Sequence, residues 1–381
     1  MAIQDPSILA PEKFFDGDSI KLDPSLFTKS GFTPVKENFL LKEHSVYKKR
    51  FDIKKGTRAV PETKHEVIFS VKENLDDLKT LVDDISNPFS ANFGKHLKRD
   101  EVTAMSANPA SFHHVMAYLS LHEIEVVGTS PYSEYITAVA PVRKWEELFA
   151  TEFYEFEMDG EDGKLMRAEK YSLSENLHDH VAAVFNTVQF PPLSRRKVIR
   201  EKYVKKTPMK PSAATYYGYT DPSLINSVYD IRNNTGNLLS SQAVYETSEE
   251  AFSPSDLTIF QQTFGLPIEA VAEDIGGYML DNACVLYDCG EGNLDVQYIM
   301  AVAQNVPTTY YYWNGSDFLL DWVTQVSNMA DPPKVISISW GGPEVGYGES
   351  YIEAFNTQAL KVSAMGGKFI LSSLCDPYDC I

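Results

Sequence analysis

Residues 291–301 read EGNLDVQYIMA, a stretch that sets two carboxylates four residues apart at the start of an apolar helix. Side chains at this spacing share one face of a helix, so Glu291 and Asp295 are expected to be neighbours in the first turn. The positive end of the helix dipole favours negative charge there. Two close carboxylates also couple their titration, which allows one of them to act as a general base. An ordinary acidic first turn on a surface helix is the alternative interpretation.

The residues that follow alternate between strand and helix patterns. β-Branched and aromatic residues indicate strands, and apolar residues at helical spacing indicate the segments between them. In order, the pattern predicts a strand over 308–313, a helix over 317–330, a strand over 334–340, a helix over 349–364 and a strand over 369–371. This alternation predicts a parallel sheet with right-handed crossovers, whose functional groups gather at the carboxyl ends of the strands.

Two blocks of motifs resemble a known family. The acid pair continues as LDVQY over 294–298 and is followed by ISISWG over 336–341, while the upstream half contains HEVIFSVKEN over 65–74 and ISNPFSANFGKHL over 85–97. The downstream block resembles the sedolisin (serine-carboxyl peptidase) family, and within it the tripeptidyl-peptidase branch. The upstream block is similar to the pro-kumamolisin-type activation domain that precedes the peptidase in that family. The resemblance covers about residues 63–374, with both blocks in the family's order.

This resemblance implies a subtilisin-like α/β peptidase in which a glutamate replaces the histidine of the usual serine triad. Glu291 would take the proton from a serine hydroxyl, and Asp295 would orient Glu291. A carboxylate base is most useful near its own pKa, so the resemblance implies hydrolysis at acidic pH, at the N-termini of peptides. Ser339, Trp340 and Gly341, at the end of one predicted strand, are expected to line the substrate cleft.

The chain departs from the family pattern after Ser373. Family members continue with a Ser-Gly-Asp-x-Gly segment whose aspartate stabilises the oxyanion, whereas residues 374–381 read LCDPYDCI. Asp376 lies one position beyond the aligned aspartate, and a shift of one residue redirects the side chain, so we do not expect Asp376 to be equivalent. A splice or gene-model boundary and a genuinely divergent C-terminus are both compatible with this change.

Two functional classes remain open. No Gly-Thr-Ser motif follows Asp295, and the family's calcium loop is also absent, so neither the nucleophile nor a cofactor is expected in these residues. The first class is a serine-carboxyl peptidase zymogen that acts on peptide or protein substrates but is inactive in the form of this chain. The second is a non-catalytic fragment whose prodomain, normally an intramolecular partner, binds or inhibits a full-length relative.

The chain divides into four segments. Residues 1–62 are interpreted as an N-terminal extension. Residues 63–190 have an α+β pattern and resemble a ferredoxin-like activation prodomain. Residues 191–213 are interpreted as a processing linker. Residues 214–381 are interpreted as the N-terminal part of an α/β subtilisin-like, parallel-sheet peptidase domain.

The composition excludes two classes of partner. The net charge is −19, and the only basic cluster lies in the predicted linker without a nucleic-acid-reading motif, so no nucleic acid is expected. No apolar run approaches the ~20 residues that span a bilayer, so no membrane partner is expected. The first residues show no secretory signal, although the family resemblance implies a lysosomal or secreted location.

Cysteines and sequons favour the secretory route. Cys284 and Cys289 precede the acid pair at a spacing that suits a loop-closing disulfide, and Cys375 and Cys380 repeat that spacing. A four-cysteine zinc site is the alternative, but the two-residue knuckle spacing is absent. Asn233 and Asn314 lie in glycosylation sequons, at 233–235 and 314–316. The sequence His178-Asp179-His180 is a further weak metal signal, more typical of a solvated or capping segment.

Overall fold

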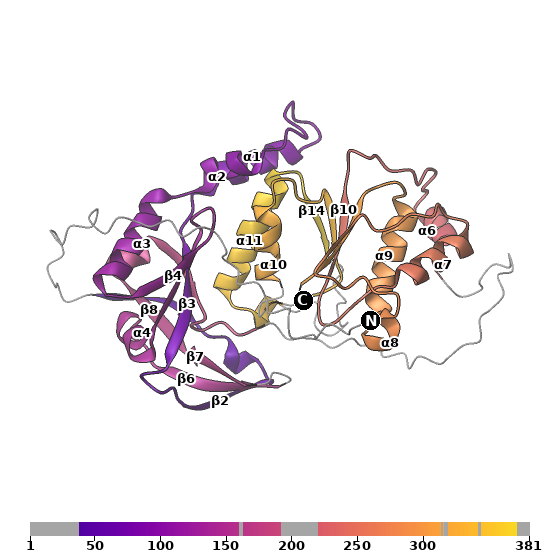
Figure 1. The fold of residues 1–381 in the computed structure, drawn as a ribbon. Coiled ribbons are helices and arrows are strands. Elements are labelled where there is room, and N and C mark those ends of the chain that lie inside the picture. The colour runs from indigo at the N-terminus through magenta and orange to yellow at the C-terminus, as the bar shows by residue number, and fades with distance from the viewer. Residues whose placement is uncertain are drawn as a thin grey trace. The chain divides into compact units, whose positions relative to one another are not determined.

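The computed structural model describes residues 38–159, 163–191, 220–313, 315, 319–341 and 344–371 (Figure 1). The contacts among these residues divide them into two compact units. The first contains residues 38–191 together with 344–364, and the second contains residues 220–341 together with 365–371. Each unit is described by itself.

The first unit is built on a four-stranded antiparallel sheet with the strand order β4-β5-β3-β9. In chain order, its elements are β3 (Lys64–Val71), α1 (Asp76–Ser86), α2 (Arg99–Ser106), α3 (Pro109–Leu121), β4 (Glu125–Thr129), β5 (Tyr135–Pro141), α4 (Val142–Leu148) and β9 (Val181–Phe185). With the helices between the strands, this is a β-α-β-β-α-β order. Alternate residues of β3 are buried, as the period of a strand with one face on a core requires.

The core of this unit lies between the sheet and helices α3 and α4. Trp145 of α4 is fully buried, stacks on Phe149 with ring centroids 5.4 Å apart, and donates its indole N–H to the carbonyl of His65 at 2.8 Å. A buried tryptophan whose N–H has a partner combines a large apolar contact with a satisfied donor. Helix α3 contributes Val115, Tyr118 and Leu119 to the same core.

Two smaller sheets extend the first unit on its N-terminal side. Strand β1 (Phe39–His44) pairs with β8 (Lys170–Ser174), and β2 (Ile53–Arg58) pairs with β6 (Phe153–Met158), which also pairs with β7 (Lys164–Ala168). A one-turn helix η3 (Tyr47–Lys49) and the short helix α5 (Glu175–His178) complete this part. The predicted boundary at residue 63 is therefore too late, because β1 and β2 belong to the folded unit.

Helix α11 (Glu349–Ala364) also belongs to the first unit, together with the short helix η4 (Glu344–Gly346) that precedes it. The sequence predicted both ends of this helix correctly but assigned it to the peptidase segment 214–381. The helix packs against α1, and the amide of Leu97 donates to the carbonyl of Ala364 at 2.9 Å. Periodicity locates a helix along the chain, but it does not identify what the helix packs against.

The second unit contains a five-stranded parallel sheet with the order β11-β12-β10-β13-β14. Its elements are α6 (Pro222–Val228), β10 (Gln242–Glu246), α7 (Pro254–Phe264), β11 (Glu273–Ile275), α8 (Ala283–Leu286), α9 (Gly290–Val302), β12 (Thr308–Tyr312), α10 (Leu320–Asn328), β13 (Val335–Ile338) and β14 (Lys368–Leu371). The predicted parallel sheet is confirmed. The sequence did not predict β10, its central strand.

Both faces of this sheet are covered (Figure 1). On one face, Val244 and Tyr310 pack with Val296 and Met300 of α9. On the other face, Trp322 of α10 is fully buried, with its ring centroid 4.1 Å from that of Tyr245. Strands β10 and β12 are accordingly buried along almost their whole length rather than at alternate residues.

Most of the predicted linker 191–213 lies outside the described residues. In the part of the chain that the structure describes, every helix is too short or too polar to cross a lipid bilayer.

The buried imidazole of His65 should make the first unit sensitive to acid. Burial, aided by the charge of Arg167, lowers the pKa of His65 from 6.5 to about 4, although its ring nitrogen Nε2 lies 2.8 Å from the carbonyl of Asn186. In the unfolded chain His65 binds a proton below about pH 6.5, so folding stability falls as the pH drops from there towards 4, by about 3 kcal/mol in all.

Urea unfolding of the chain at pH 7 and pH 4.5 measures this loss. The variant His65→Gln, whose amide can still donate to Asn186 and which does not titrate, should show a clearly shallower pH dependence. His113→Gln, at an exposed position of α3, is the matched control and should behave as the wild type. Equal pH dependence of His65→Gln and wild type would contradict the prediction.

Candidate functional site

The two predicted acids lie at the start of α9, Glu291 in its first turn and Asp295 one turn later. Both Glu291 and Asp295 are half-buried, and Cys289 occupies the N-cap position of the helix. Between them, Gly292 approaches the loop after β10 so closely that an added Cβ would lie 2.5 Å from the carbonyl oxygen of Ala251. Only glycine fits here, so the first turn is packed onto the sheet rather than exposed on a surface helix.

Asp295 is hydrogen-bonded at the end of a neighbouring strand. The hydroxyl of Ser339 donates to Asp295 Oδ2 at 2.6 Å. Ser339 directly follows β13, so the bond joins the helix to the carboxyl edge of the sheet, where open parallel sheets place their functional groups. Trp340 lies next to Ser339, and Gly341 is exposed after it.

A third carboxylate completes this edge, and sequence reasoning did not identify it. Glu246 is the last residue of β10 and is fully buried, and its Oε2 accepts the indole N–H of Trp340 at 2.9 Å. The sequence offers one signal for it, a charged residue at the end of the apolar run 243–245. Many surface turns show the same pattern, so this signal does not identify a site. The tertiary pairing of β10 with β13 brings Glu246 and Trp340 together.

These carboxylates surround a tyrosine that remains neutral. Burial raises the pKa of Tyr310 well above its usual value, and the negative charges of Glu246, Asp274 and Asp295 raise it further. The Tyr310 hydroxyl donates to the carbonyl of Glu250 at 3.2 Å. Its single proton is therefore used by a backbone carbonyl, and the phenol adds no further negative charge to this edge.

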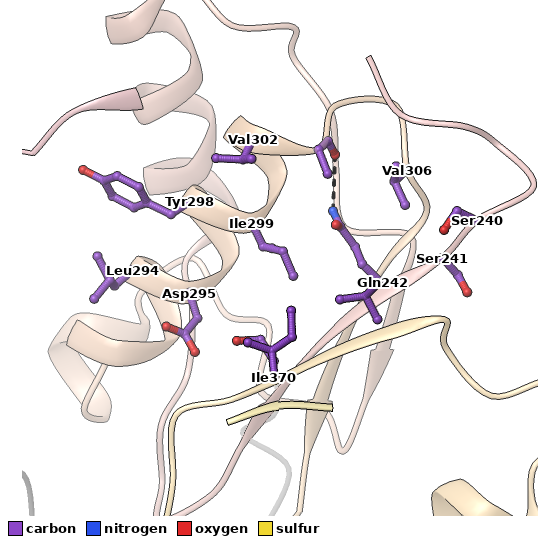
Figure 2. Close-up of a pocket in the computed structure, with 13 residues that line it drawn as sticks. Ser240, Ser241, Gln242, Leu294, Asp295, Tyr298, Ile299, Val302, Val306 and Ile370 are labelled. Carbon is purple, nitrogen blue, oxygen red and sulfur yellow. Dashed lines mark hydrogen bonds between the residues drawn. The ribbon is translucent and has the colours of Figure 1, made fainter. Parts of the chain in front are cut away.

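A groove of about 430 Å³ runs beside the acid pair (Figure 2). Asp295, Ile299 and Val302 of α9 form one side of it, and Ile370 of β14 lies opposite. Its remaining lining residues are Ser240, Ser241, Gln242, Leu294, Tyr298, Ala303, Val306, Val335 and Ser337. The groove therefore offers a mostly apolar surface with a carboxylate at one end.

The other predicted site residues fall in different places. Cys284 and Cys289 form a disulfide. Asn233 is exposed, and its side-chain oxygen accepts the backbone N–H of Thr235 at 3.1 Å. The remaining candidates, Asp376, Cys375, Cys380 and Asn314, lie outside the described residues.

The weak metal signal at 178–180 has a structural explanation. His180 stacks on His114 with ring centroids 3.9 Å apart, and its Nδ1 lies 3.0 Å from the Ser111 hydroxyl. Across the described ranges, no three histidine, cysteine, aspartate or glutamate side chains converge as metal ligands would.

The chain does contain one Gly-Thr-Ser sequence, at residues 128–130, but it lies in the first unit. Ser130 is buried, and its oxygen accepts the backbone N–H groups of Glu134 and Tyr135 at 2.8 and 2.9 Å. Those contacts fix a turn between β4 and β5. This serine therefore has a structural role in the first unit.

Comparison with known proteins identifies several similar chains. A family model described as "Pro-kumamolisin, activation domain" matches residues 52–190. Tripeptidyl-peptidase 1 of Homo sapiens is 27% identical over 330 residues, which are 83% of this chain and 57% of that protein. Tripeptidyl-peptidase 1 of Dictyostelium discoideum is 27% identical over 343 residues, 81% of this chain and 56% of that protein.

Among solved structures, a Pseudomonas sedolisin (serine-carboxyl proteinase) complexed with two molecules of pseudo-iodotyrostatin matches with a TM-score of 0.33 and 20% identity, over 42% of this chain and 46% of that one. The chain thus spans little more than half the length of the curated relatives it matches.

The contact between Trp340 and Glu246 should be required for the stability of the second unit. Replacing Trp340 by phenylalanine removes a donor from a fully buried carboxylate, which should lower the free energy of unfolding by about 2 kcal/mol. Urea unfolding of Trp340→Phe, Glu246→Gln and the double variant measures the coupling. The Trp340→Phe loss should be smaller when position 246 is already neutral. Identical losses in both backgrounds would show that the two side chains do not interact.

Proposed function

Because this chain belongs to the sedolisin family of serine-carboxyl peptidases, we propose that it combines an activation prodomain with the acid-pair half of a tripeptidyl-peptidase-like zymogen. The observation that supports this most directly is the acid pair itself. Glu291 lies in the packed first turn of α9 and Asp295 lies one helical turn later, where it accepts the Ser339 hydroxyl at 2.6 Å at the carboxyl edge of the sheet.

In the proposed reaction, Glu291 is the general base. It accepts the proton of a serine hydroxyl as the serine oxygen attacks the carbonyl carbon of a peptide bond, and it returns that proton to the leaving amine. Asp295 orients Glu291 and shares its negative charge, while Ser339 holds Asp295 in place. A carboxylate base serves best at acidic pH, since carboxyl groups titrate in that range. The relatives are named tripeptidyl-peptidases, so the proposed substrates are peptides, cleaved at their N-termini as the family resemblance implies.

The first unit supports the zymogen assignment. Its β-α-β-β-α-β order with antiparallel neighbours fits a ferredoxin-like prodomain over residues 38–191, and this range includes the segment that matches the activation-domain model. The proposed processing segment follows at 191–213. An acidic compartment of the secretory pathway, such as the lysosome, fits the Cys284–Cys289 disulfide and the exposed sequon at Asn233.

We further propose that these 381 residues do not hydrolyse peptides by themselves. Asp295 is not followed by a Gly-Thr-Ser sequence, and losing a nucleophile removes most of the rate enhancement of such an enzyme. The wild-type chain, acidified and incubated with a tripeptide amide, should give no turnover above the blank. Turnover that Glu291→Gln abolishes would contradict this.

A chimera tests the roles of the two acids. With the remaining C-terminal segment of a full-length relative joined after Ser373, the chain should hydrolyse the tripeptide amide at acidic pH. Glu291→Gln should then lower kcat by several orders of magnitude without loss of folding, because the general base is gone. Asp295→Asn should act in the same direction but less severely. The two losses should be far from additive, since the residues act as one unit.

Glu273→Gln, which neutralises an exposed acid at the sheet edge, is the matched control and should retain full activity. Activity that survives Glu291→Gln, or independent effects of the two substitutions, would show that the acid pair has no catalytic role and is an ordinary acidic helix start.

A second candidate function, binding a relative in trans, is favoured by the contacts of α11. Lys361 is fully buried, with its ammonium group 2.7 Å from Glu73 Oε2 and also bonded to Glu134. Arg99 donates to Glu134 at 2.9 Å, so two cations and two carboxylates balance inside the unit. Gln358 donates to the Tyr135 hydroxyl at 3.0 Å.

Glu73 and Glu134 form a carboxylate face on the first unit. This face should bind a helix that carries a lysine in preference to a helix that does not. Removing one partner of a buried ion pair leaves an uncompensated charge and costs several kcal/mol, so a helix without the lysine should bind poorly. A full-length relative that presents such a helix could displace α11 and be inhibited.

Two substitutions should therefore change inhibition in opposite directions. Lys361→Met weakens the hold on the chain's own helix and should increase inhibition of a mature relative, by at least about tenfold in inhibition constant. Glu134→Gln impairs the face that receives the lysine and should reduce inhibition. Glu66→Gln, at an exposed position of β3, is the control. No inhibition by wild type and by Lys361→Met would exclude this second function.

A further inference from the structure

The turn that follows β10 has an unusual backbone. Ser248 and Glu249 adopt φ angles of 54° and 62°, in the left-handed region that residues other than glycine rarely occupy. Among the described residues, they are the only two successive non-glycine residues with positive φ. The backbone N–H of Glu250 donates to the carbonyl of Thr247 at 3.1 Å and closes the turn. Turns with two positive φ angles favour Asn-Gly or Asp-Gly, so a Ser-Glu pair is strained here.

Contacts on both sides hold this turn in place. The backbone N–H of Glu249 donates to the Tyr312 hydroxyl at 3.1 Å, and the Tyr312 ring stacks on Tyr278 with centroids 3.5 Å apart. Glu250 is fully buried, and its Oε2 accepts the backbone N–H of Gly292 at 2.9 Å. Strained residues persist only where the surrounding structure fixes them, and these contacts do so.

The turn leaves the side chain of Glu249 exposed near the acid pair. Within the part of the chain that the structure describes, no hydrogen bond or ion pair involves its carboxylate. Gly292, which donates to Glu250, directly follows Glu291 in α9. One peptide unit, the Glu250 side chain and one hydrogen bond therefore connect Glu249 to the acid pair, a path of about 15 Å at most. Strained residues cluster at sites that bind ligands, and a carboxylate binds positive charge.

We propose that Glu249 is a specificity-determining residue that binds the N-terminal ammonium group of the peptide substrate. The inference rests on the proposed function, in which peptides are cleaved at their N-termini. An extended tripeptide spans about 10 Å, so a group that binds its ammonium has to lie about that far from the acid pair. The path from Glu249 to Glu291 is compatible with this length. An ammonium group is charged at acidic and neutral pH, and its N–H groups form strong hydrogen bonds to a carboxylate.

The strain of the turn and the charge of Glu249 can be separated by substitution. A glycine at position 249 would fit the left-handed backbone without strain, but it would remove the carboxylate. A glycine at position 248 would relieve strain in the same turn and keep the carboxylate. The proposal requires that binding follows the charge and not the strain.

The test uses the whole 381-residue chain and needs no hydrolysis. Nuclear magnetic resonance of the nitrogen-15-labelled chain follows the binding of two probes, a tripeptide amide with a free N-terminus and the same tripeptide amide with an acetylated N-terminus. The free-amine peptide should shift the amide signals of residues 247–250. It should also bind about fivefold more tightly than the acetylated peptide, as an exposed pair of opposite charges allows.

Variants of the turn test whether the carboxylate causes this preference. Glu249→Gln and Glu249→Gly should bind both peptides equally, whereas Glu249→Asp and Ser248→Gly should still prefer the free amine. Neither glycine variant should lower the midpoint of urea unfolding, because glycine tolerates positive φ. Glu273→Gln, which removes a different exposed acid of the second unit, is the matched control and should behave as the wild type.

The chimera with the C-terminal segment of a relative gives a second measurement. The ammonium contact is the same in the substrate and in the transition state, so Glu249→Gln should raise KM for the free-amine tripeptide amide about fivefold and leave kcat nearly unchanged. An inactive chimera, with the preference for the free amine intact in the 381-residue chain, would refute the proposed reaction and uphold the binding role of Glu249.

Two results would overturn the inference and leave the proposed function intact if the chimera is active. One is equal binding of both peptides to the wild type, and the other is a preference that survives Glu249→Gln. A third probe, the acetylated tripeptide amide with lysine at its first position, distinguishes two sources of positive charge. If it binds as tightly as the free-amine peptide, Glu249 binds a side-chain ammonium and the assignment to the N-terminus is wrong.

Discussion

The second unit depends on the hydrogen bonds that its carboxylates accept at the carboxyl edge of the parallel sheet. Glu246 receives the indole N–H of Trp340, Glu250 receives the backbone N–H of Gly292, and Asp295 receives the hydroxyl of Ser339. An ionised carboxylate buried without such donors would cost several kcal/mol of desolvation. With them, negative charge accumulates beside the acid pair. The bonds that stabilise this edge are therefore the same bonds that build the candidate site.

The first unit contains buried cations, and their donors are hydrogen-bonded to oxygen atoms. Arg167 is buried, and burial lowers its pKa to about 10; it donates to the carbonyls of Gln189 and Met166 at 2.5 and 2.8 Å. Arg50 pairs with Asp52 and donates to the carbonyl of Pro191 at 2.5 Å. Both arginines therefore hold the backbone at residues 189–191, directly before the predicted linker.

Local signals in the sequence predicted some elements well and missed others for a physical reason. The helix 349–364 was located at both ends because an apolar stripe persists over four turns. Strand β10 was missed because five buried residues show no period that distinguishes them from a loop or a helix. Strands β1 and β2 contain lysines and half-exposed residues, and β1 pairs with β8 more than 120 positions away, so nothing nearby in the sequence marked them as part of the first unit.

Some features of the candidate site could likewise be predicted from the sequence, and others could not. The sequence by itself determined that Glu291 and Asp295 share one face of a helix, because helical geometry brings residues four apart onto one face whatever the rest of the chain does. The bond of Asp295 with Ser339, the bond between Glu246 and Trp340, and the bond of Asn293 with Ser253 join residues 40 or more positions apart. So does the contact of Lys361 with Glu73 inside the first unit. Only the tertiary structure decided these, because they depend on which strands pair and which helices pack together, and no local period in the sequence encodes that choice.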